Sequence, residues 1–168
     1  MIEDNGLENL SLSRLAAQLD VKAPSLYKHV ENKAAIIEAV NHATYRELSA
    51  TILDKTANIS DPIERLLTFS RAYREFAHSN PITYQLALGA DLRGDEKVLE
   101  ELAKQMETLL QPLVEAGQTL PALRGLWALV HGFVMLEINH QMRRGGDMNA
   151  TFEIIVERFI RSWQTLHP

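Results

Sequence analysis

Side chains able to contact nucleic acid gather in one short stretch near the start of the chain, residues 21–30, which read VKAPSLYKHV. At helical spacing, Lys22, Ser25 and Lys28 share the outward side of this stretch. Lysine can donate to guanine O6 and N7, serine can donate or accept, and alanine and proline carbons can touch a thymine methyl. Tyrosine, histidine and a further lysine can reach phosphates. The residues predicted to contact DNA are Ser13, Lys22, Ala23, Pro24, Ser25, Tyr27, Lys28, His29 and Lys33.

A helix–turn–helix would position these side chains. Ser11 can cap a first helix over about 12–19, and Asp20 tolerates the left-handed conformation that a tight turn needs. The second helix, over about 23–30, would present its N-terminal residues to the major groove. The side chains expected to be buried beneath it are Leu12, Leu15, Ala16, Leu19, Val21, Leu26 and Val30. The alternative is an ordinary solvated helical hairpin, in which Lys22, Lys28 and Lys33 carry no function.

Composition restricts what else the chain can be. Its 168 residues are 46% apolar with a formal net charge of −5, so any DNA contact must come from a local basic patch. The lack of cysteine excludes disulfides, thiolate metal sites and a cysteine nucleophile, and it suits the cytoplasm. No uninterrupted apolar run reaches the roughly 18 residues of a membrane span, and no secretory signal is visible. We expect no membrane partner, no metal and no cofactor.

The spacing of apolar residues predicts an all-α fold, because they recur at intervals of three and four along most of the chain. After a helix–turn–helix module assigned to residues 1–38, we expect a helical effector-binding and dimerisation domain over 39–168. Asp61 before Pro62 predicts an N-cap, Pro112 predicts a kink, and Gly117 predicts a left-handed helix end. The longer helices are expected at about 33–56, 61–78, 81–89, 95–116, 121–143 and 149–166.

The helix predicted over 121–143 is apolar nearly all round, since His131 and Glu137 are its only ionisable residues between positions 126 and 138. Such a helix is buried on more than one side, either in the centre of a monomer or between its own core and a second subunit. The helix over 149–166 has an apolar seam with alternating steps of four and three, typical of packed helices. We therefore expect a homodimer through these two helices, with close approach at Gly125, Ala128 and Gly132.

Candidate ligand-binding residues lie between positions 61 and 143. Ligand sites are largely apolar with a few placed polar groups, and this segment has that character. His131 is either a ligand contact or a buried histidine satisfied by a neighbouring hydroxyl or carbonyl. The expected ligand is an unidentified small molecule that is hydrophobic and partly polar. The candidates are Tyr73, Phe76, Tyr84, Met106, Trp127, His131 and Met135, although methionines in such helices are more often plain core.

Motifs of known catalytic chemistry are missing from the sequence. It has no Gly-x-Ser-x-Gly, no glycine-rich phosphate loop and no His-Glu-x-x-His. Asp61, Glu100 and Glu157 each have a basic residue four positions on, as in Glu157 and Arg161, the spacing of surface ion pairs on a helix. The six histidines show no spacing typical of a metal site. These patterns predict no catalytic residues and argue against an enzyme.

The string PSLYKHVENK at residues 24–33 resembles the DNA-binding segment of the tetracycline-repressor (TetR) family of bacterial transcription regulators. Trp127, His131 and Gly132 are similar to the Trp…His-Gly signature of the C-terminal ligand-binding domain in one branch of that family. The resemblance implies a homodimeric repressor that reads a palindromic operator in double-stranded DNA. It also implies that a small-molecule effector binds the C-terminal helices and releases the DNA.

The chain departs from the family pattern in two places. Family members carry a complete first helix before the turn at Asn5-Gly6, whereas only the residues MIED precede that turn here. We therefore expect a less stable N-terminal module with reduced DNA affinity. The alternative function is a helical small-molecule-binding or interaction protein that does not bind DNA. Lys22 stands where the family often has a capping serine or threonine, and lysine cannot cap, although it could contact phosphate.

Overall fold

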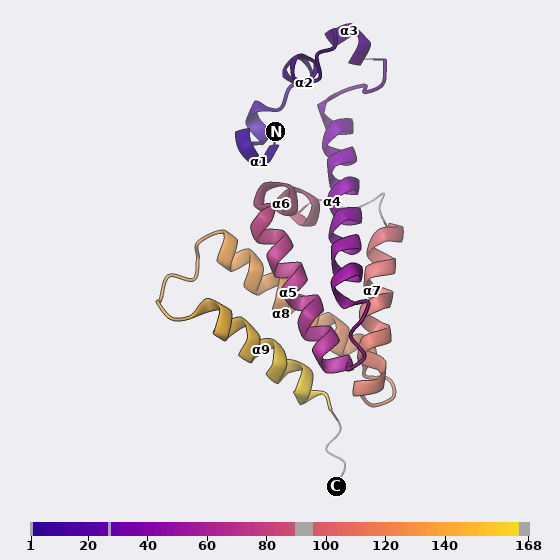
Figure 1. Cartoon of the computed structure of the whole chain (residues 1–168), viewed down its shortest axis with the longest axis vertical. Helices are drawn as coiled ribbons and strands as arrows, with labels where there is room; N and C mark the ends of the chain where they lie inside the picture. The colour runs from indigo at the N-terminus through magenta and orange to yellow at the C-terminus, as the bar shows by residue number, and fades with distance from the viewer. Residues whose placement is uncertain (1, 27, 90–95, 165–168) are drawn as a thin grey trace.

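The structure is a computed structural model that describes residues 2–26, 28–89 and 96–164. Within these ranges every regular element is a helix, so the prediction of an all-α fold is confirmed. Figure 1 shows a small group of helices at one end, joined through one long helix to a larger bundle. The elements are α1 (Ile2–Asn5), η1 (Leu7–Asn9), α2 (Leu12–Gln18), α3 (Ala23–Leu26), α4 (Lys33–Thr56), α5 (Pro62–Ser79), α6 (Pro81–Gly89), α7 (Glu96–Leu110), η2 (Gln111–Leu113), α8 (Thr119–Ile138) and α9 (Met148–Ser162).

Side-chain caps begin several of these helices where the sequence predicted. The Ser11 hydroxyl accepts from Arg14 N at 3.2 Å at the start of α2, and Asp61 Oδ2 accepts from Glu64 N at 2.8 Å at the start of α5. Asp20, with φ 52°, ends α2 in the left-handed conformation expected of it. Helix α4 then runs without a break from the small module into the bundle, so the predicted domain boundary at residues 38–39 falls inside it.

Four predicted helices are shorter in the structure, among them the one expected over 149–166, which ends at Ser162. The helix expected over 95–116 ends at Leu110, because Pro112 sits in the short η2 turn rather than kinking a continuous helix. Helix α8 ends at Ile138 instead of residue 143, where His140 takes a positive φ of 55°. Helix α3 covers only Ala23–Leu26, and Lys28 and His29 lie in a turn after it.

Two apolar cores support the two ends of the molecule. The main core is formed by α4 to α9 around side chains such as Leu66, Tyr73 and Leu126, which are almost fully buried. The small core, centred on Ile2 and Ile36, is completed by apolar residues of α6. The small module formed by α1, η1, α2 and α3 therefore has no closed core of its own, and it shares one with α6.

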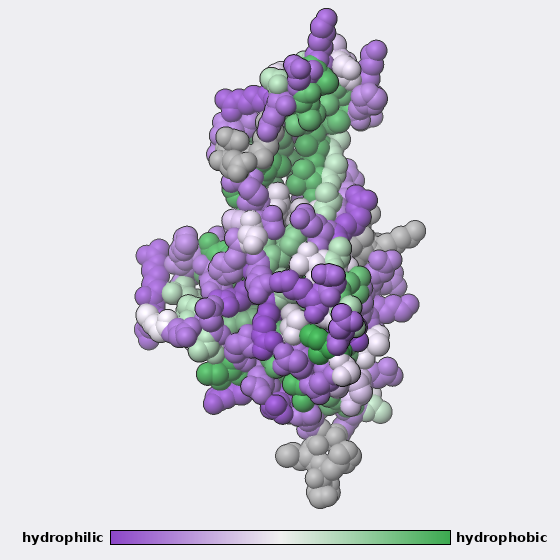
Figure 2. Space-filling view, viewed as in Figure 1, coloured by the Kyte–Doolittle hydropathy of each residue, from purple (hydrophilic) through white to green (hydrophobic). Residues whose placement is uncertain are grey.

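Burial in the small module is less complete than the sequence predicted. Ala16 is buried as expected, but Leu19 is 56% exposed and Val21 is 44% exposed. These two residues flank the tight turn, where the short helices α2 and α3 leave no further element to cover them. Apolar side chains are visible on this end of the molecule in Figure 2, above a larger domain whose visible face is mostly hydrophilic.

Helix α1 occupies the place where we expected most of a first helix to be missing. It is a single turn, yet Ile2 is buried and packs in the small core beside Ile36. The N-terminal residues therefore contribute to the core of the small module. The expected loss of stability and DNA affinity stays a prediction.

By length and composition alone, helix α8 is long and apolar enough to cross a membrane. Within the described chain, 33% of its most apolar stretch is buried. The central helix of a soluble bundle has the same character, and α8 packs against α5, α7 and α9. Gly125 lies against α9, because a Cβ placed there would come within 2.5 Å of Phe159 Cζ. A Cβ at Gly132 would meet nothing within 4 Å. The small residues therefore serve the chain's own packing at Gly125 and leave open space at Gly132.

Candidate nucleic-acid interface and ligand site

The residues predicted to read DNA lie on the surface of the small module. Ala23 is half-buried, and Tyr27 lies outside the described residues. Val30 is half-buried and packs against the small core, as the spacing predicted, and Leu26 is half-buried as well. The remaining predicted contacts are all exposed, namely Ser13, Lys22, Pro24, Ser25, Lys28, His29 and Lys33.

Backbone hydrogen bonds carry the reading segment past the end of α3. Ser25 N donates to Lys22 O at 2.8 Å, and His29 N and Val30 N both donate to Leu26 O, at 2.9 and 3.0 Å. Lys28 and His29 are thus presented from a hydrogen-bonded turn rather than from a helix. Lys22 makes no side-chain cap, and only its carbonyl accepts from the first turn.

Two basic side chains near this surface are tied to the N-terminal segment. Lys33 Nζ donates to Leu7 O at 2.9 Å, and Arg14 Nη1 donates to Asn9 Oδ1 at 2.6 Å. Lys33 was predicted to reach phosphate, and the structure gives it this bracing contact in addition. Arg14 was not predicted as part of the interface, although it directly follows Ser13 in the first turn of α2.

Three of the predicted ligand-binding residues meet in a hydrogen-bonded cluster. The Tyr73 hydroxyl lies 3.1 Å from His131 Nδ1, the Tyr84 hydroxyl lies 2.9 Å from the same nitrogen, and the two hydroxyls are 2.9 Å apart. These residues come from α5, α6 and α8. Trp127 packs edge-on against Tyr73, with ring centroids 5.5 Å apart. The structure thus favours the histidine satisfied by neighbouring hydroxyls, one of the two alternatives for His131.

Burial sets the protonation of this cluster, which we call the tyrosine–histidine cluster. Desolvation lowers the pKa of His131 and raises the pKa values of Tyr73 and Tyr84. All three side chains are therefore neutral at neutral pH, and His131 Nδ1 can accept a hydrogen bond from a tyrosine hydroxyl. The cluster offers hydroxyl and imidazole hydrogen-bonding groups in apolar surroundings.

The other predicted ligand residues belong to the main core. Phe76 is 6% exposed and Met106 is 1% exposed. Met135 is half-buried at the edge of the same core. For Met106 the structure supports the plain-core alternative given above.

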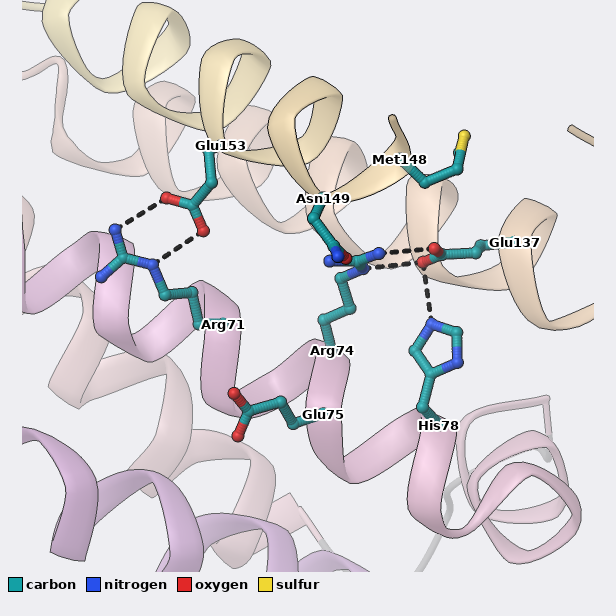
Figure 3. A pocket seen from close by; sticks show the side chains of 8 residues that line it. All are labelled: Arg71, Arg74, Glu75, His78, Glu137, Met148, Asn149 and Glu153. Atoms are coloured by element: carbon teal, nitrogen blue, oxygen red, sulfur yellow. Dashed lines mark hydrogen bonds and ion pairs between the residues drawn. The ribbon is translucent and has the colours of Figure 1, made fainter. Parts of the chain in front are cut away.

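A charged cleft was missed by sequence reasoning. It has a volume of about 560 Å³ and lies between α5, the end of α8 and the start of α9. Figure 3 shows Arg71 facing Glu153 and Arg74 facing Glu137 across it. Arg71 Nε and Nη2 each lie 2.7 Å from a Glu153 oxygen, and His78 Nε2 lies 2.9 Å from Glu137 Oε2. These charges neutralise one another and join three helices.

No group of three or more histidine, cysteine, aspartate or glutamate side chains suited to a metal occurs in the described part of the chain. In the tyrosine–histidine cluster and in the charged cleft, the polar side chains form hydrogen bonds with side chains of other helices. The chemistry available at these sites is hydrogen bonding and charge pairing.

Two segments of the chain match known protein families. Residues 1–40 match the family described as "Bacterial regulatory proteins, tetR family", and residues 66–159 match "Tetracyclin repressor-like, C-terminal domain". An uncharacterised HTH-type transcriptional regulator of Mycobacterium tuberculosis is 28% identical over 162 residues, covering 94% of this chain and 73% of that protein. The class E tetracycline repressor of Escherichia coli is 28% identical over 122 residues, covering 70% of this chain and 52% of that protein.

Solved structures share the fold. A protein of unknown function from Rhodococcus sp. RHA1 superposes with a TM-score of 0.83 at 19% identity, covering 98% of this chain and 90% of that one. A TetR variant from Acinetobacter baumannii in complex with minocycline gives a TM-score of 0.69 at 23% identity, covering 96% and 89%. The matched families are regulators rather than enzymes. With the second family match spanning more than half of its residues, the chain belongs to the TetR family of DNA-binding transcriptional regulators.

Proposed function

We propose that this regulator is a cytoplasmic homodimeric repressor that binds a palindromic operator and is released by a small-molecule effector. The observation that carries the proposal is the exposure of Lys22, Ser25 and Lys28 on a helix–turn–helix at one end of the molecule. Lysine and serine at the start of a reading helix are suited to base edges in the major groove. The rest of the chain is then free to dimerise and to bind an effector.

Exposed apolar side chains on α8 and α9 support the homodimer. Leu120, Leu136 and Ile154 are 44%, 42% and 48% exposed, and α8 adds Ala128 and Gly132 at helical steps of four. Large apolar residues exposed on two neighbouring helices are typical of a surface that a second copy covers. Two copies joined there would present two reading modules, as a palindrome requires.

The dimer surface can be tested with a matched control. Leu136→Glu places a charge on the proposed surface and should shift the protein from dimer to monomer in sedimentation velocity. Leu53→Glu introduces the same charge at a residue of α4 that is equally exposed, at 44%, and should leave the dimer intact. A dimer that survives Leu136→Glu would rule out this surface.

The tyrosine–histidine cluster is the proposed effector site. An entering molecule could exchange hydrogen bonds with Tyr84 and His131 while its apolar part packs near Trp127. Release of DNA requires that the effector bind one state of the dimer more tightly than the other. Tyr84 is the residue of this cluster on α6, the helix that also contacts the DNA-binding module.

Selection from random DNA duplexes tests the function directly. The wild-type chain should enrich a palindromic duplex, with affinity that falls steeply as salt rises, because phosphate contacts release counterions. Lys28→Ala and Ser25→Ala should alter the preferred sequence, whereas Lys33→Ala should weaken all sequences about equally. Lys104→Ala, on α7, is the control and should change neither property. Enrichment of no duplex would leave the alternative of a small-molecule-binding protein without DNA affinity.

A further inference from the structure

Helix α6 lacks a cap from its own sequence. Pro81 at its start has no N–H, and Tyr84 N already donates to Asn80 O at 2.9 Å. The N–H groups of Ile82 and Thr83 therefore need partners outside the helix. Asn80, which stands in the N-cap position, donates its side chain to Phe76 O at 3.1 Å and faces back toward α5.

A carboxylate from the DNA-binding module supplies the missing cap. Glu3 Oε2 accepts from Ile82 N at 3.0 Å, and Glu3 Oε1 accepts from Thr83 N and Thr83 Oγ1, both at 2.6 Å. A negative charge at a helix N-terminus is favoured by the partial positive charge of the unpaired amides. Glu3 lies 79 positions before Ile82 in the chain, so this is a long-range contact between the two parts of the protein.

Neighbouring contacts make α6 a connecting element. Beside Glu3, Ile2 is buried in the small core, which also includes Ile82. One residue past Thr83, the Tyr84 hydroxyl meets His131 Nδ1 at 2.9 Å. A displacement of α6 that breaks the Tyr84 contact would thus also disturb the cap at Glu3.

We propose that Glu3 is a positioning residue for DNA binding: as the external cap of α6, it fixes the orientation of the reading module relative to the sensor bundle. This inference deepens the proposed function and rests on it. An effector that shifts α6 would detach Glu3 from its donors, and the loosened module would lose operator affinity. The contact acts on DNA through α3, since Glu3 itself is acidic and unsuited to phosphate.

The direction in which DNA affinity changes separates a positioning role of Glu3 from a simple effect of its charge. Glu3→Gln and Glu8→Gln each remove one negative charge from the DNA-binding module, which on its own strengthens binding to a polyanion. Glu8 is exposed and lies in η1, so it serves as the matched control. We expect Glu3→Gln to weaken binding about tenfold, a typical coupling between two parts of a protein, while Glu8→Gln shows no loss.

A second variant separates positioning from helix stability. Asn80→Asp gives α6 a local capping carboxylate, and in the double variant Glu3→Gln/Asn80→Asp it should restore the melting temperature but not the DNA affinity. Affinity is measured on the duplex that the wild type selects, well below the melting temperatures of all variants. Recovery of wild-type affinity in the double variant, or equal affinities for Glu3→Gln and Glu8→Gln, would overturn the proposal.

Hydrogen exchange without DNA keeps this test independent of the operator. In Glu3→Gln, the amides of Ile82 and Thr83 should exchange faster, and so should those of α2, because the module is no longer fixed to α6. Faster exchange confined to α6 would show that Glu3 only caps the helix and would refute the positioning role. If the wild type selects no duplex, the proposed function fails, and this exchange experiment still decides whether Glu3 fixes the module.

Discussion

Arg74→Met should lower the free energy of unfolding by about 3 kcal/mol at pH 7, which is the loss expected for breaking a largely buried ion pair. Arg74 Nε donates to Glu137 Oε2 at 2.7 Å and Nη2 donates to Oε1 at 2.5 Å. The two side chains are only 15% and 12% exposed, so solvent screens the pair weakly. Methionine keeps much of the side-chain volume but leaves the Glu137 carboxylate without its main partner.

Neighbouring groups set the magnitude. Removal of one partner of a buried pair costs about 3–5 kcal/mol, and His78, 2.9 Å from Glu137, reduces the cost because it still donates to the carboxylate. The guanidinium also lies 5.9 Å from the centroid of the Phe133 ring and 5.0 Å from that of Phe152, and this contact adds about 0.5–1 kcal/mol. These opposing contributions leave an expected loss near the lower end of the range.

The loss should depend on pH with a defined sign. The hydrogen bond from Arg74 is the main cause that lowers the pKa of Glu137 below its ordinary value of 4.5. A carboxyl whose pKa is lower in the folded state stabilises the fold above its unfolded pKa, and this stabilisation disappears as the pH falls through the folded pKa. The difference between wild type and Arg74→Met should therefore be full at pH 7 and should narrow below about pH 4.

Urea unfolding followed by circular dichroism at pH 7 and pH 3 measures both effects, at one fixed protein concentration because a dimer links stability to concentration. Arg161→Met is the control, since its partner Glu157 lies 2.8 Å away on the exposed surface of α9 and such pairs contribute about 0.5 kcal/mol or less. A loss in Arg74→Met no larger than in Arg161→Met, or equal at both pH values, would refute the reasoning.

Three further predictions concern His131, Gly125 and Asp20. Burial lowers the pKa of His131, so wild-type stability should be full above its ordinary pKa of 6.5 and fall as the pH drops below it; urea unfolding at pH 7.5 and 5 should show a smaller fall in His131→Gln. Gly125→Ala should lower the free energy of unfolding, measured by thermal unfolding, by about 1 kcal/mol, because its Cβ would come within 2.5 Å of Phe159 Cζ and the ring must shift, whereas Gly145→Ala meets open space and should change little. Asp20→Val should destabilise the protein by about 1–2 kcal/mol in the same assay and Asp20→Gly should not, because φ there is 52°.

Helix positions could be predicted where the signal is local. The caps at Ser11 and Asp61 depend on residues within three positions, and each forms the predicted hydrogen bond. Asp20 ends α2 with Asp20 N and Val21 N donating back to Ala17 O and Ala16 O, the pairing of a Schellman end. Such interactions are written in a few neighbouring residues, so the sequence is sufficient to place them.

The predicted end of a helix was wrong where a residue other than glycine took the left-handed position. Helix α8 finishes with His140 N donating to Glu137 O and Gln141 N donating to Leu136 O, again a Schellman end. Glycine usually marks that position, and here it is a histidine, so the apolar pattern suggested a helix that ran five residues too far. The early end of the reading helix after Leu26 has no comparable local signal.

The residues of the tyrosine–histidine cluster could be predicted from the sequence, but the hydrogen bonds between them could not. Tyr73, Tyr84 and His131 stand out as polar groups in apolar helices, which is visible in the sequence. Their meeting depends on how α5, α6 and α8 pack, and this is settled by the whole core. The same holds for Glu3 and Arg74, whose partners lie 79 and 63 positions away or more, beyond any local pattern.

The kinds of contact differ between α5 and α6, and this difference bears on how a signal could travel. Helix α5 is joined to α8 and α9 by two charged, bidentate pairs, Arg74–Glu137 and Arg71–Glu153. Helix α6 is joined to its neighbours through the hydroxyls of Tyr84 and Tyr45 and by the cap from Glu3. The two tyrosine hydrogen bonds are neutral, so each contributes less than a charged pair and is readily exchanged for a bond to a polar ligand, whereas the Glu3 cap is charged. A ligand that competes for the Tyr84 hydroxyl would therefore break this contact of α6 more readily than a charged pair of α5, and α6 is the helix to which the DNA-binding module is capped.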